Sequence, residues 1–176
     1  MDTETEEIPE EAQPAKLFDL PATEGVNESE RILTALCHQT FLRLWSQTNV
    51  YTDDGFKNGK GATKELCDAL VVFGKDVILF SDKHVFFNEA KGIEVAWRRW
   101  YKKAVYESCR QLHGAKLWLE RFPQRAFLDA KCTRPLPVSV PAENVDFHLV
   151  AVTRGSREAA LAHNSGVGRG SFAVNN

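Results

Sequence analysis

The sequence predicts a mixed α/β fold in which a helix is followed by three strands, a long helix and further strands. Three observations predict it. Residues 66–73 and 77–83 are apolar runs that meet at the Gly-Lys-Asp turn 74–76. Apolar residues recur at helical spacing before these runs and again over about 91–121. At 176 residues the chain is long enough for one sizeable domain.

The first helix is predicted over about 28–47. The segment 27–30, Asn-Glu-Ser-Glu, offers a capping start. An apolar stripe at helical spacing follows, made of Ile32, Leu33, Leu36, Phe41, Leu44 and Trp45. Residues 48–62 are rich in turn formers, and we expect them to form a loop that leads to the next strand.

The two central strands are expected to pair and to be buried on both faces, because little polar surface lies between their ends. The pairing would bring Asp68 near Ser81, Asp82 and Lys83. Charged groups at the ends of such strands need partners or a metal ion. Asp68 and Glu65 offer hard oxygen ligands of the kind that Mg²⁺ binds. Lys83 could then orient or activate an attacking water.

The remaining elements follow from periodicity and breakers. A short third strand is expected at 85–87, and the long helix over about 91–121 ends before a proline. Residues 126–129 and 147–152 are predicted as two more strands, and 156–163 as a short helix.

At the central strands the chain resembles the PD-(D/E)XK nuclease superfamily, in particular its nuclease-related branch. There, a short acidic run leads one strand and an acid-x-Lys triplet ends the next. The resemblance implies an αβββαβ restriction-endonuclease-like core, with a central mixed sheet flanked by helices. It places Glu65 and Asp68 at the leading acidic positions and Lys83 at the triplet lysine, with Mg²⁺ or Mn²⁺ as the cofactor. Glu30 on the first helix is a weaker candidate for a further carboxylate.

The triplet departs from the family pattern at its first position, where Ser81 replaces the acid. The nearest acid, Asp82, faces the other side of a regular strand, and a β-bulge would be needed to turn it inward as a metal ligand. Without a bulge the site has lost a ligand. The branch also carries a glutamine on the following helix, which Gln111 matches, although an exposed helix residue is an equally good interpretation.

The net charge of −2 conceals a division within the chain. Residues 1–30 hold ten acids and one base, for −9, which leaves 21 bases and 14 acids, for +7, in the remainder. We expect a disordered acidic leader at 1–26, a nuclease-like domain at 27–163 and a flexible tail at 164–176. With no signal peptide and no membrane-spanning run, a cytoplasmic location is the default expectation.

The basic excess is concentrated on the long helix, and it suggests a surface that binds the phosphates of nucleic acid, DNA in preference to RNA. A plain solvated helix face is the alternative. The residues with the strongest case are Arg98, Arg99, Lys102, Lys103 and Arg110. The four cysteines and five histidines show no spacing typical of a zinc site.

Three functions stay open at this point. The first is a divalent-metal-dependent nuclease in which Lys83, Asp68, Glu65, Asp82 and Gln111 form the site. The second is an inactive fold of the same type that binds nucleic acid or a protein partner. The third is a structural or interaction domain of a larger assembly.

Overall fold

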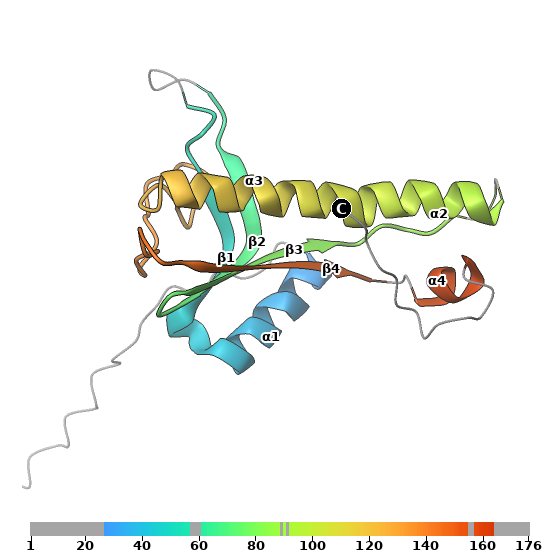
Figure 1. Ribbon diagram of the computed structural model, residues 1–176, viewed down its shortest axis with the longest axis horizontal. Coiled ribbons are helices and arrows are strands. Elements are labelled where there is room, and N and C mark those ends of the chain that lie inside the picture. Colours follow the sequence, from blue (N-terminus) through green and yellow to red (C-terminus); the bar gives the residue numbers. More distant parts are fainter. Residues whose placement is uncertain (1–26, 57–60, 89, 91, 155–156, 164–176) are drawn as a thin grey trace, which may run out of the picture.

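The computed structural model describes residues 27–56, 61–88, 90, 92–154 and 157–163 (Figure 1). The predicted acidic leader and the glycine-rich tail lie outside the described residues. The elements, in chain order, are α1 (Glu28–Trp45), β1 (Ser46–Thr52), β2 (Lys64–Phe73), β3 (Asp76–Lys83), α2 (Ile93–Tyr101), the π-helical segment η2 (Lys102–Tyr106), α3 (Glu107–Arg121), β4 (Asp146–Thr153) and α4 (Arg157–His163). None of the described helices combines the length and the apolar character that a membrane span requires.

The four strands form one mixed sheet in the order β1-β2-β3-β4. β1, β2 and β3 pair antiparallel, whereas β4 runs parallel to β3. A parallel neighbour requires a long crossover connection, and α2, η2 and α3 supply it as one continuous helix. This long helix covers one face of the sheet and α1 covers the other (Figure 1). The predicted mixed α/β class is therefore confirmed.

The core lies on both faces of β2 and β3. Leu112 and Leu119 of α3 pack with Leu70 and Leu79 on one face. On the other face Leu33 and Cys37 of α1 pack with Ala69, Val71 and Phe80. The prediction that the central strands are buried on both faces is confirmed, and so are the first helix and its Asn27 cap, whose side chain accepts from the Glu30 backbone N–H.

The loop predicted over 48–62 is wrong in its first part, because Ser46–Thr52 form strand β1. Most of this strand is built from polar residues that are nevertheless buried, so it lacks the apolar alternation by which strands are recognised. Its polar groups have local partners. The Ser46 hydroxyl donates to the Leu42 carbonyl, and the Gln47 amide donates to that of Arg43.

Two predicted short strands do not form. Residues 84–88 follow β3 without a sheet partner among the described residues, and Val85 and Phe87 pack instead against a cluster around Trp100. Residues 126–129 make only isolated bridges, from Phe127 to Tyr51 and to Pro135. Prolines punctuate this part of the chain, and a residue without an N–H cannot continue a ladder.

Candidate active site

An irregularity in β2 places two acids on one face. In the β1–β2 register Val50 lies opposite Cys67, but Tyr51 lies opposite Glu65, so Leu66 is an extra residue on β2. An extra residue interrupts the alternation of side chains along a strand. Glu65 and Asp68, three positions apart, would lie on opposite faces of a regular strand. The bulge allows their side chains to meet.

The carboxyl groups of Glu65 and Asp68 are hydrogen-bonded to each other. Burial of the Glu65 carboxyl group, this hydrogen bond and the negative charge of Asp68 together raise the pKa of Glu65 to about 7. Lys83 opposes the rise, and Glu30 adds to it. Glu65 is exposed as a whole residue, yet it lines a cavity, where its carboxyl group is both accessible and partly dehydrated. The partial dehydration and the neighbouring acid both favour the protonated form.

The backbone of β3 holds Asp68 in place. Asp68 is only 6% exposed, and its Oδ2 accepts the Asp82 backbone N–H at 2.6 Å. The paired residues of β2 and β3 end at Ala69 and Phe80, so the Asp68 carboxylate binds an amide just beyond the end of the ladder. Two of its interactions are thus fixed by the fold, one with a main-chain donor and one with Glu65.

Lys83 of β3 and Gln111 of α3 line the same cavity as Glu65. Gln111 is held by Ser81, which is fully buried and whose Oγ donates to Gln111 Oε1 at 3.3 Å. A cavity of about 350 Å³ lies here. Its walls are formed by Thr52, Asp54, Lys64, Glu65, Leu66, Lys83, Glu107, Arg110, Gln111, Gly114, Ala115 and Trp118. Four of the five predicted catalytic residues therefore gather at one place, with Asp68 contacting Glu65 at its edge.

Asp82 is the residue that the structure does not bring to this site. Its side chain is fully buried, and its carboxylate accepts from the Ser29 hydroxyl and, at 3.2 Å, from Arg154 Nη2. β3 pairs with β4 residue by residue from Asp76 to Lys83, so the bulge considered for Asp82 does not form. The regular alternation of side chains along β3 turns the Asp82 side chain away from Asp68. The prediction that Asp82 is a metal ligand beside Glu65 and Asp68 is corrected accordingly, because its carboxylate lies on the other face of the strand.

The adjacent pair Glu65 and Asp68 offers two carboxylates to a cation. Within the described ranges, no group of three His, Cys, Asp or Glu side chains is placed to hold a metal ion. Mg²⁺ commonly takes one or two protein carboxylates and completes its coordination with water and substrate oxygens. Glu65 and Asp68 meet that requirement, and the raised pKa of Glu65 means that this side chain can exchange its proton for a cation near neutral pH.

The five predicted phosphate-binding residues are all exposed on the long helix. Arg110 lines the cavity beside Glu65. Arg99, Lys102 and Lys103 line a second cavity of about 490 Å³, and Glu107 lines both. Arg98 is exposed on α2 but does not line either of these two cavities.

Sequence reasoning missed the contact of Ser81 with Gln111, and it missed Arg154 altogether. Ser81 orients Gln111 and Arg154 accounts for Asp82. Side chains alternate between the two faces of a strand, and Ser81 lies two residues before Lys83. The sequence therefore indicates that Ser81 and Lys83 share a face of β3. No local signal marks Arg154, whose contact with Asp82 spans 72 residues.

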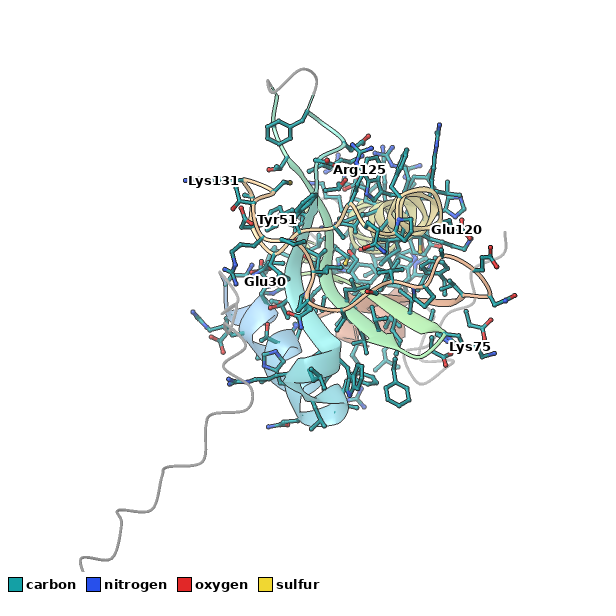
Figure 2. The ribbon with its side chains drawn as sticks, turned by 90° about the vertical axis from the view of Figure 1, so that its left-hand side faces the viewer. Glu30, Tyr51, Lys75, Glu120, Arg125 and Lys131 are labelled. Carbon is teal, nitrogen blue, oxygen red and sulfur yellow. The ribbon has the colours of Figure 1, made fainter. Side chains whose placement is uncertain are left out.

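Figure 2 shows the end of the molecule where Glu30 of α1 and Tyr51 of β1 lie. Burial and the charges of Glu65 and Glu30 raise the pKa of Tyr51, which places these groups within electrostatic reach of one another.

Comparisons with protein-family models, with curated proteins and with solved structures found no match for the chain. We therefore infer a function from the side chains described above.

Proposed function

We propose that the chain is a divalent-metal-dependent hydrolase of nucleic-acid phosphodiesters. The observation that carries the proposal is the hydrogen-bonded pair of Glu65 and Asp68 beside Lys83. Holding two carboxylates close together costs folding free energy unless a bound group offsets it. Carboxyl groups with strongly shifted pKa values in a cavity are typical of functional sites. The resemblance to the PD-(D/E)XK superfamily, which rests on the same residues, supports the same reaction class.

Glu65 and Asp68 would bind Mg²⁺ or Mn²⁺ through their carboxylate oxygens. When bound, the ion would supply Lewis-acid activation of water and stabilisation of charge on the phosphate. Asp68 is the better anchored of the two, because its backbone partner holds it independently of the ion. Glu65 has to lose its proton first, so we expect cation binding to strengthen as the pH rises through about 7.

Lys83 and Gln111 would act directly on the substrate. The Lys83 ammonium offers three donors, which can hold a non-bridging phosphate oxygen or the attacking water. A Gln111 amide that accepts from Ser81 can donate through Nε2 to a second oxygen. Arg110, in the same cavity wall, adds a positive charge where the phosphodiester enters.

The second candidate is a binding module of the same type without turnover. One observation favours it: Ser81 takes the place of the triplet acid, while Asp82 is engaged by Ser29 and Arg154. In that case the exposed bases of the long helix would still bind nucleic acid, and no cation would be needed.

The test is cleavage of labelled single- and double-stranded DNA and RNA with Mg²⁺ or Mn²⁺. Asp68→Asn and Lys83→Ala are the informative variants. Their matched controls are Asp146→Asn and Lys75→Ala, which form an exposed ion pair with 2.6 Å between Lys75 Nζ and Asp146 Oδ2. Lys75 lies at the turn between β2 and β3 (Figure 2), and Asp146 is the first residue of β4. We expect metal-dependent cutting that both informative variants abolish and both controls keep. Binding without cutting under either metal would reject the enzyme in favour of the binding module.

A further inference from the structure

A second cavity continues from the candidate active site along the long helix. One wall is the segment that follows β3, with Val85, Phe86 and Asn88. The other wall is the helix itself. Glu107 lines both cavities, so they adjoin at the start of α3. Figure 1 shows the segment after β3 running alongside α2.

Phe86 is presented to solvent at this cavity. It is 84% exposed, the largest exposed fraction among the exposed large apolar residues of the described chain. Val85 and Phe87, on either side of Phe86, pack against the cluster of Trp100, Ala104 and Val105. These contacts anchor the segment. Phe86 therefore makes little contribution to the core, and it is one of the residues that line the cavity.

The opposite wall carries positive charge. Arg99, Lys102 and Lys103 all line the cavity and are all exposed. Lys102 and Lys103 belong to the π-helical segment η2, and π-type turns inside α-helices often occur at functional sites. Glu107, at the junction of the two cavities, is the one acid among the lining residues.

We propose that this cavity binds unpaired nucleotides of a single strand, next to the phosphodiester held at Glu65 and Asp68. Phe86 would stack on a base, while Arg99, Lys102 and Lys103 would contact the phosphates on either side. An aromatic ring facing cations across a groove is the usual arrangement for single strands, and duplex bases, already stacked on each other, offer no free face. The cavity volume is within the range of sites for small ligands, as one stacked nucleotide requires. The position relative to the cleaved bond rests on the proposed function, whereas the binding itself does not.

The test is binding of a labelled oligo(dT) and of a duplex of equal length, measured by fluorescence anisotropy with EDTA present. Phe86→Ala should weaken binding of the single strand by about 5- to 150-fold, the range for loss of one stacked base, and should leave duplex binding unchanged. Phe86→Trp should restore it. Phe73→Ala is the matched control, because Phe73 is a second exposed phenylalanine, at the end of β2.

The role of the positively charged residues is tested by the salt dependence of binding. A Lys102→Ala/Lys103→Ala double variant should lower the salt dependence of single-strand binding by roughly 0.7 in the log–log slope for each phosphate that the variant no longer neutralises. Arg43→Ala, on α1 across the sheet, should not change the slope. The proposal is overturned if Phe86→Ala binds as tightly as the original chain, or if Phe73→Ala weakens binding equally.

Failure of this proposal and failure of the nuclease are distinguishable, because binding is measured without a divalent ion. Phe86-dependent binding together with no cleavage under Mg²⁺ or Mn²⁺ would reject the nuclease and keep the single-strand site. Cleavage that is unaffected by Phe86→Ala, with binding equally unaffected, would reject this site and keep the nuclease.

Discussion

Asp68 Oδ2 accepts the backbone N–H of Asp82 at 2.6 Å, while the Asp82 carboxylate is bound by Ser29 and Arg154 on the other side of the strand. The two acids are therefore linked through the main chain but serve different parts of the molecule. Asp68 faces the candidate active site. Asp82 joins the end of β3 to the start of α1 and to Arg154, just after β4.

The first prediction concerns this division of roles. Arg154→Ala should lower the free energy of unfolding by about 3 kcal/mol, because it leaves the fully buried Asp82 carboxylate without its cationic partner. Urea unfolding measures the change. The variant should still bind Mn²⁺ where it remains folded. A folded Arg154→Ala chain that no longer binds Mn²⁺ would show that Asp82 belongs to the site after all.

The second prediction is a pH dependence of stability. The pKa of Glu65 is raised from 4.5 to about 7 in the folded chain, so between these values the folded state binds more protons than the unfolded state. The free energy of unfolding should therefore fall as the pH rises through this window, without a divalent ion. Glu65→Gln should flatten this fall in urea titrations, and Glu28→Gln, exposed on α1, should not. Equal slopes for Glu65→Gln and the original chain would contradict the shift.

The third prediction uses the departure at Ser81. Ser81→Asp adds a carboxylate on the face that carries Lys83, beside Asp68. Because position 81 is fully buried, the variant should be less stable without metal, and Mg²⁺ should raise its melting temperature more than that of the original chain. Ser46→Asp, equally buried beside Val71, is the control and should show no added response to Mg²⁺. The same response in both variants would exclude a cation site at Asp68.

The fourth prediction tests the packing that places Gln111. Leu112 is 1% exposed and packs with the core on the α3 face of the sheet, so Leu112→Ala should cost about 2–5 kcal/mol of stability. Leu117, on the same helix but 51% exposed, should cost under about 1 kcal/mol when changed to Ala. Chemical denaturation of the two variants compares them directly. Similar losses would mean that α3 does not pack as described.

Most of the fold could be predicted because its signals are local. The apolar runs of β2 and β3, the Gly74 turn with its positive φ of 58° and the stripe of the long helix all stand out in the sequence. β1 could not be found in the same way, since most of its residues are polar and become buried only when α1 and β2 pack against them. Tertiary context overrides local propensity at such a strand.

The sequence indicates which residues gather at the candidate site, but it does not indicate the geometry that brings them together. The resemblance points to Glu65, Asp68, Lys83 and Gln111, and in the structure these four residues lie close together, while their role as a site stays a prediction. The irregularity, however, lies at Leu66 in β2 and not at Asp82 in β3. A bulge depends on how two strands pair, and residue spacing along one strand does not contain that information.

The most direct test of the central claim is a Mn²⁺ titration followed by electron paramagnetic resonance at about pH 8, above the pKa of Glu65. The intact chain should bind Mn²⁺, Asp68→Asn should lose that binding while keeping its fold, and Asp82→Asn should retain it. If the intact chain binds no Mn²⁺, or if Asp68→Asn binds it equally well, Glu65 and Asp68 are not the metal-binding pair of a hydrolytic site.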